Sequence, residues 1–126
     1  MPKCNFLFFI NAYNDLQQTT APALNNFKWS REINGVPYTI EKSQQLQVPI
    51  TTTSANLVTS AASFIYLESD VQVSVIYNGG TAMVLTPFQI DGRTQPAVFF
   101  MAGPATSLTV TNSGTATANI FFASMG

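Results

Sequence analysis

Alternation of apolar and polar residues constrains the fold of this chain more than any other feature. The apolar residues of segment 71–77 alternate with mostly polar neighbours, and Asn78-Gly79-Gly80 follows directly. A period of two places successive side chains on opposite faces of a strand, and an Asn-Gly pair accepts the positive φ of a hairpin turn. The sequence therefore predicts a strand with one inward face, followed by a chain reversal.

The rest of the C-terminal two-thirds predicts further strands. Segments 107–111 and 115–122 alternate in the same way, with a turn at Asn112-Ser113-Gly114. Asp91-Gly92-Arg93 predicts a plain β-turn in preference to an exposed recognition tripeptide. Segment 63–67 predicts a strand before a turn at Glu68-Ser69-Asp70. Segment 81–90 predicts the returning strand, with a bulge, edge or break at Pro87. Segment 97–101 predicts a short strand that is closed by Gly103-Pro104.

The N-terminal third is less regular. Segment 4–12 predicts a strand, and the polar segment 14–26 predicts a loop. Residues 27–33 predict a strand that carries Phe27, Trp29 and Arg31 on one face and ends in a turn at Asn34-Gly35. Segment 38–50 predicts one or two strands, and Gln44-Gln45 inside it indicates a turn or a wide loop.

These elements together predict one all-β domain over residues 1–126. No segment has a sustained helical period, and about eight or nine short strands separated by turn signals are typical of a sandwich or barrel. We expect an antiparallel two-sheet β-sandwich and favour a jelly roll, with an immunoglobulin-like sandwich or a small barrel as the alternatives. Residues 1–53 are expected to form the less regular part, with the first strand, loops and a partner-contacting region.

The charge content restricts the partners. Only 9% of the 126 residues are charged, against about 25% in a typical soluble domain. Such a chain either covers much of its surface with partners or stays soluble through neutral polar groups. The five cations are scattered, so nucleic-acid binding, which needs clustered cations, is not expected. The apolar segment 6–10 is too short for a membrane span of about 20 residues, and Cys4, the one cysteine, predicts a small apolar strand residue.

The sequence lacks the usual residues of catalysis. It contains no histidine, which excludes a Ser-His-acid triad, a Cys-His pair and histidine-based metal sites. Glu68 and Asp70 could serve as a carboxylate pair for glycoside hydrolysis or calcium, but a solvated strand-end turn is favoured because no further acidic residue is near them in sequence. We therefore expect no enzyme activity, no catalytic residue, no cofactor and no metal.

The aromatic residues supply the candidate contact site. Ten Phe, four Tyr and one Trp are expected to serve the core first, a protein interface second and sugar stacking third. Trp29, Tyr38 and Tyr66 would be the stacking platform of a sugar-binding module. The predicted partner interface consists of Phe27, Trp29, Arg31 and Tyr38.

Residues 63–123 resemble small virion proteins of tailed bacteriophages, most closely capsid decoration (cement) proteins. The resemblance rests on strand-and-turn patterns within this half of the chain: Phe64–Asp70, Val71–Gly80, Phe99–Pro104, Ser107–Gly114 and Ala118–Ala123. It implies a homotrimer, made in the host cytoplasm, that sits on the outer capsid surface of the virion and clamps neighbouring major capsid protein subunits. No catalytic residues come with such a family.

Two other functions remain open. A carbohydrate-binding or receptor-binding module is indicated by Trp29, the tyrosines and the polar Asn, Gln and Thr residues. A tail or baseplate structural component would share the same composition.

Overall fold

The computed structural model describes residues 3–11, 28–37 and 41–126. These residues form an all-β, antiparallel structure without a helix. Its strands are β1 (Lys3–Asn11), β2 (Lys28–Pro37), β3 (Glu41–Val48), β4 (Thr52–Thr53), β5 (Ala62–Ser69), β6 (Val73–Tyr77), β7 (Met83–Leu85), β8 (Phe88–Ile90), β9 (Arg93–Gln95), β10 (Ala97–Ala105), β11 (Leu108–Asn112) and β12 (Ala118–Met125).

The chain divides into two compact units, Met1–Tyr38 and Thr39–Gly126. The single domain expected over residues 1–126 stays a prediction. In the first unit, β1 pairs antiparallel with β2. The turn predicted at Asn34-Gly35 is wrong, because β2 runs through both residues and the pairing shifts register between Cys4 and Phe6 on β1. Asn34-Gly35 thus lies at an irregularity of the β-bulge kind within a strand.

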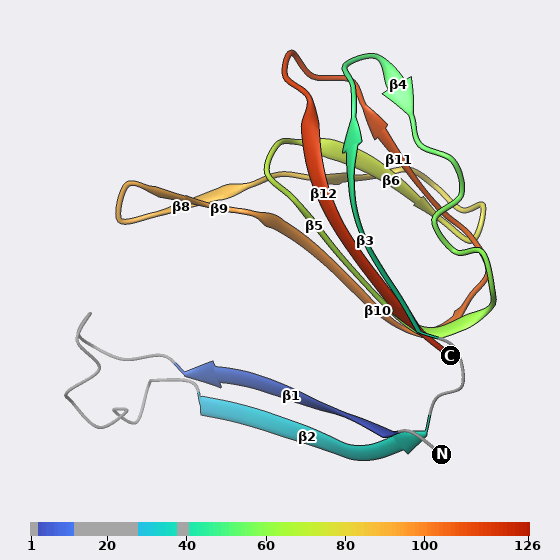
Figure 1. Ribbon diagram of the computed structural model, residues 1–126. Coiled ribbons are helices and arrows are strands. Elements are labelled where there is room, and N and C mark those ends of the chain that lie inside the picture. Colours follow the sequence, from blue (N-terminus) through green and yellow to red (C-terminus); the bar gives the residue numbers. More distant parts are fainter. Residues whose placement is uncertain (1–2, 12–27, 38–40) are drawn as a thin grey trace. The chain divides into compact units, whose positions relative to one another are not determined.

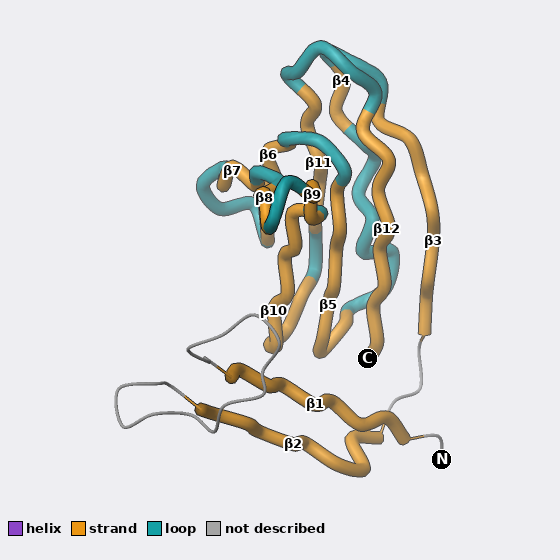
Figure 2. The backbone as a smooth tube through the Cα atoms, turned by 90° about the vertical axis from the view of Figure 1, so that its left-hand side faces the viewer, coloured by secondary structure: helices purple, strands orange, loops and turns teal. Residues whose placement is uncertain are grey.

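The second unit contains two four-stranded sheets, with the orders β10-β5-β12-β3 and β4-β11-β6-β7 (Figures 1 and 2). Their strands pair in a nested way: β3 with β12, β4 with β11, β5 with β10 and β6 with β7. The chain is thus paired like a long hairpin whose two arms alternate between the sheets. Strands β8 and β9 form a separate hairpin.

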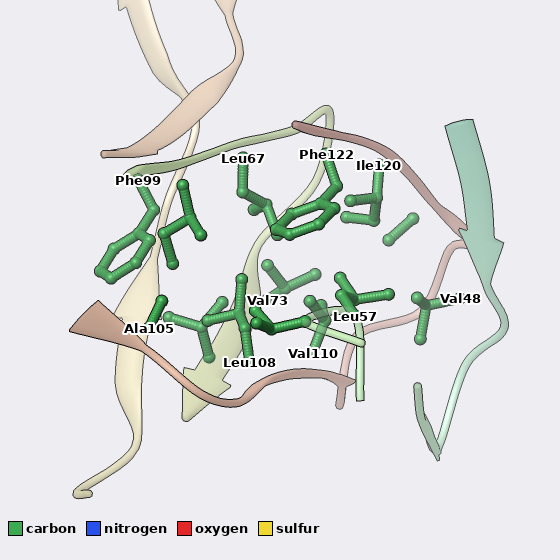
Figure 3. Close-up of a cluster of buried hydrophobic side chains, with 14 of the residues drawn as sticks. Val48, Leu57, Leu67, Val73, Phe99, Ala105, Leu108, Val110, Ile120 and Phe122 are labelled. Atoms are coloured by element: carbon green, nitrogen blue, oxygen red, sulfur yellow. The ribbon is translucent and has the colours of Figure 1, made fainter. Parts of the chain in front are cut away.

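One hydrophobic core joins the two sheets (Figure 3). The strands predicted from alternation supply it: Val73 and Val75 point inward from β6, and Ile120 and Phe122 from β12. Phe122 is fully buried and is among the largest side chains in this core. The other buried hydrophobic members come from both sheets and from the segment after β4: Val48, Leu57, Val58, Ala62, Ile65, Leu67, Phe99, Ala105, Leu108, Val110 and Ala118.

Two turn predictions are corrected by the sheet β10-β5-β12-β3. Gln44-Gln45 forms no turn, because both residues lie inside β3 and pair with β12. Gly103-Pro104 does not close its strand, because β10 continues to Ala105 through a register shift that begins after Ala102. Pro104 is tolerated because β10 is an edge strand, where a missing amide N–H need not break the sheet.

The other breaks follow the turn chemistry of the sequence. Segment 81–90 is divided into β7 and β8 around Pro87, one of the outcomes expected there. The turn after β5 begins at Asp70, two residues later than the start predicted at Glu68, since β5 extends through Ser69. Asn78 adopts φ 51° and Gly79 φ 68°, which confirms the reversal after β6.

Two asparagines connect the loops to the sheets. The buried Asn112 amide donates to the carbonyls of Val48 (2.9 Å) and Ala116 (2.8 Å) and accepts from the Gly114 N–H (2.9 Å). Asn78 Oδ1 accepts from the Thr106 N–H at 2.7 Å, while its Nδ2 donates to the Pro104 carbonyl at 2.8 Å. Each asparagine therefore satisfies backbone groups far from its own turn.

Candidate functional site

The interface predicted in the N-terminal third is only partly within the described structure. Phe27 and Tyr38 lie outside the described residues. Trp29 and Arg31 lie in β2, where they pair with Ile10 and Phe8 of β1. The partner role of these residues stays a prediction.

The second unit carries a different apolar surface on residues 83–98, which we call the apolar arm. Among residues 42–126, the exposed large hydrophobic residues are Ile50 and five residues of this arm. The β8–β9 hairpin of the arm extends away from the two larger sheets (Figure 1). The arm residues and their exposed fractions are Met83 (37%), Val84 (62%), Phe88 (51%), Ile90 (52%) and Val98 (49%).

The β8–β9 hairpin places its two exposed apolar side chains on one face, directly opposite Gln95 and Arg93 of β9. Phe88 and Ile90 are two residues apart in β8, so they share a face. On the other face, Gln89 Nε2 donates to Thr94 Oγ1 at 2.6 Å. The turn at the tip has positive φ at Asp91 (50°) and Gly92 (73°), which confirms the β-turn predicted there.

A groove lies on the outer face of the sheet β10-β5-β12-β3, and we call it the outer groove. It has a volume of about 550 Å³ and opens between the ends of three strands and the residue before β10. The residues that line it are Gln45, Leu46, Gln47, Glu68, Ser69, Asp70, Pro96, Asn119, Ile120 and Phe121.

Cross-strand pairing arranges the floor of this groove in two rows. Phe121 pairs with Gln45 of β3 on one side and with Glu68 of β5 on the other. Asn119, two residues before Phe121, pairs with Gln47. Residues directly opposite on neighbouring strands have Cβ atoms about 4.5–5.5 Å apart, so an aromatic ring lies between an amide and a carboxylate.

The second row is held by hydrogen bonds. Gln47 Nε2 donates to Asn119 Oδ1 at 3.1 Å, and Asn119 Nδ2 donates to Asp70 Oδ2 at 2.6 Å. Asp70 Oδ1 accepts from the Asn119 N–H at 2.8 Å. These bonds run across three segments of the sheet and fix the orientation of all three side chains.

Tyr66 and Glu68 form a further pair on the same face. The Tyr66 hydroxyl donates to Glu68 Oε1, and the Tyr66 ring meets Phe121 edge-on with centroids 6.2 Å apart. Burial raises the pKa of Tyr66 to about 12, together with smaller contributions in the same direction from the hydrogen bond to Glu68 and from the negative charge of Glu68. Tyr66 therefore stays protonated as a donor at neutral pH.

The described residues show neither a cluster of metal ligands nor a membrane helix. They hold no group of three or more Cys, Asp or Glu side chains that could bind a metal ion. Glu68 and Asp70 instead serve as acceptors for Tyr66 and Asn119. No helix in the described part of the chain is long and apolar enough to cross a membrane.

No protein-family model, curated protein or solved structure matches this chain.

Sequence reasoning missed both surfaces. Phe88 and Ile90 belong to the segment predicted as one returning strand, and their exposure depends on the break at Pro87. The outer groove had a visible signal, because Phe121 stands on the polar face of its alternating segment. Of the one or two strands predicted in segment 38–50, the structure has the single strand β3, and its path through Gln44-Gln45 completes the groove.

Proposed function

We propose that this chain is a virion structural protein of the decoration type. It binds the outer surface of a capsid as a homotrimer and stabilises contacts between major capsid subunits. The observation that carries this proposal is the apolar arm, whose side chains are about half exposed at Phe88 and Ile90. Large contiguous apolar patches on a soluble protein mark interaction sites.

The arm suits a contact with other chains. A two-stranded hairpin is marginally stable on its own in water, so covering its apolar face stabilises it. Asp91 and Arg93 at the tip carry opposite charges, and neither forms an ion pair within the described residues. In a ring of copies, Asp91 of one copy can pair with Arg93 of the next, which favours self-association.

The strand order supports a jelly roll as the finer description of the fold. A jelly roll is a double-sheet arrangement of eight strands in two Greek keys. The nested pairing of β3 with β12, β4 with β11, β5 with β10 and β6 with β7 suits this topology. Jelly rolls recur in viral capsid proteins and in lectins, so the fold supports the proposal by analogy alone.

The low charge supports the same function. A domain in which 9% of residues are charged has few groups to desolvate when neighbours cover it. The Lys42 ammonium group is engaged within the domain. Its Nζ donates to the Leu57 carbonyl at 2.9 Å and lies 6.0 Å from the Phe122 ring centre. Many weak contacts on a lattice then add up through multivalency.

The test uses gradient-purified particles of the virus that encodes the chain. We expect mass spectrometry to detect the chain in stoichiometric amounts, and gold-labelled antibody to mark the head. Particles that lack the chain would overturn the proposal. Label confined to the tail would replace it with a tail or baseplate role.

A further inference from the structure

We infer that the outer groove binds a neutral oligosaccharide, with one pyranose ring on Phe121 between Gln45 and Glu68. Binding of this kind goes beyond capsid decoration and does not depend on it. The groove also differs from the platform of Trp29, Tyr38 and Tyr66 considered from the sequence. It draws its ligand-facing groups from β3, β5 and β12.

The size and rigidity of the groove suit a small ligand. Its volume of about 550 Å³ falls within the roughly 300–1,000 Å³ of ligand pockets. Its floor consists of paired strands in one sheet, and the chain of bonds through Gln47, Asn119 and Asp70 holds polar groups in place. A ligand therefore meets a largely preformed surface, which lowers the entropy lost on binding.

The polar groups retain capacity for hydroxyl ligands. Gln45 makes no side-chain hydrogen bond within the described residues, so its amide can both donate and accept. Gln47 uses its Nε2 internally, which leaves Oε1 as an acceptor. Glu68 uses Oε1 for Tyr66, so its second oxygen is an acceptor too. Sugar hydroxyls, each a donor and an acceptor, match this mixture of groups.

The aromatic side chain supplies the apolar part of the site. Phe121 is half-buried, borders the groove and is braced by the edge-on contact with Tyr66. A pyranose ring presents an apolar C–H face with hydroxyls around its rim. Placed on Phe121, such a ring directs its rim towards Gln45 and Glu68, the cross-strand partners on either side.

Charge selects neutral sugars over acidic ones. Two carboxylates, Glu68 and Asp70, line the groove, and no lysine or arginine does. The two cations of the second unit are used elsewhere: Lys42 points to the core and Arg93 lies on the arm. An anionic sugar would meet uncompensated negative charge, which disfavours binding.

The affinity of one groove is expected to be modest, because an open site covers only part of its ligand. If the chain decorates a lattice, as proposed above, many copies would engage a sugar-coated surface at once. Avidity then exceeds single-site affinity by about 10²–10⁴-fold. This extension rests on the proposed function, whereas binding by the single groove does not.

The experiment is an NMR titration of the full isolated chain with cellotriose, maltotriose, galactotriose and, as the acidic probe, trigalacturonate. We expect saturable amide shifts around Gln45, Asn119 and Phe121 with at least one neutral probe, and binding at least tenfold weaker with trigalacturonate. Gln45→Ala removes one ligand hydrogen bond and should raise Kd about threefold to tenfold. Phe121→Leu keeps apolar bulk, removes the ring and should raise Kd similarly.

Gln72→Ala is the matched control, because Gln72 is also exposed but lies outside the groove. Its Kd should equal that of the unmodified chain, and the melting temperatures of Gln45→Ala and Gln72→Ala should agree. The inference is overturned if no neutral probe gives saturable shifts at the groove, if Gln45→Ala and Gln72→Ala bind alike, or if trigalacturonate binds as well as the neutral sugars. None of these results bears on whether the chain is found in virions.

Discussion

The apolar arm gives the sharpest prediction, through the double substitution Phe88→Ser with Ile90→Ser. These side chains are 51% and 52% exposed in the free chain. Full burial of such a side chain contributes about 1.5–3 kcal/mol, so covering the exposed half contributes about 1 kcal/mol each. The pair then contributes about 2 kcal/mol per contact, which corresponds to a roughly 30-fold weaker association constant in the variant.

The assay is sedimentation velocity over a dilution series of the full chain. The matched control is Ile50→Ser, because Ile50 is 46% exposed but lies outside the arm. The control should associate like the unmodified chain, and urea unfolding of all variants should agree within about 0.5 kcal/mol because the changes are at the surface. Equal association constants for the arm variant and the unmodified chain would refute the role of the arm.

Three further predictions concern the polar groups of the second unit. Asn112→Ala removes three hydrogen bonds at a buried site and should lower the free energy of unfolding by about 3 kcal/mol in urea, whereas Ser113→Ala in the same turn should change it by less than about 0.5 kcal/mol. Asn78→Ala should be about 1 kcal/mol less stable than Asn78→Gly by the same measurement, because φ is 51° there. The pKa of Tyr66 is raised to about 12 in the folded chain, against about 10 in the unfolded chain. The protonated Tyr66 hydroxyl therefore stabilises the fold below pH 10, and this stabilisation is lost as the pH rises from about 10 to 12. Glu68→Gln should lower that pKa, read from the tyrosine ring carbon shifts in an NMR titration, and an unchanged value would show that Glu68 does not raise it.

The alternating strands could be predicted from sequence because their pattern and their burial have the same cause. Val73 and Val75, like Ile120 and Phe122, face one core at every second position. A strand with one buried face has a strongly specified register. This part of the fold therefore follows from local pattern alone.

The turn signals that failed were overridden by pairing. Gln44-Gln45 has a polar composition, yet its backbone forms a ladder with β12, a strand far away in sequence. Asn34-Gly35 and Gly103-Pro104 lie at or beside register shifts, where a strand accommodates residues that otherwise end it. Local propensity cannot reveal a partner strand that supplies these hydrogen bonds.

The two surfaces depend on tertiary structure in different ways. The exposure of Phe88 depends on where the hairpin points after the break at Pro87, which no local pattern encodes. The outer groove needs the register of β3 and β5 on either side of β12, which brings Gln45 and Glu68 to Phe121. The alternating pattern of segment 115–122 places Phe121 on the polar face, but it says nothing about these cross-strand neighbours.

The mass of the unmodified chain in solution tests most directly whether this domain works while covered by other copies. Light scattering on the full chain at about 100 µM, well above the Kd expected of a stable contact, gives that mass without a label. We expect three times the 13.6 kDa of one chain, falling towards the single-chain mass for Phe88→Ser with Ile90→Ser. A single-chain mass for the unmodified protein at every concentration would contradict the proposed assembly through the arm.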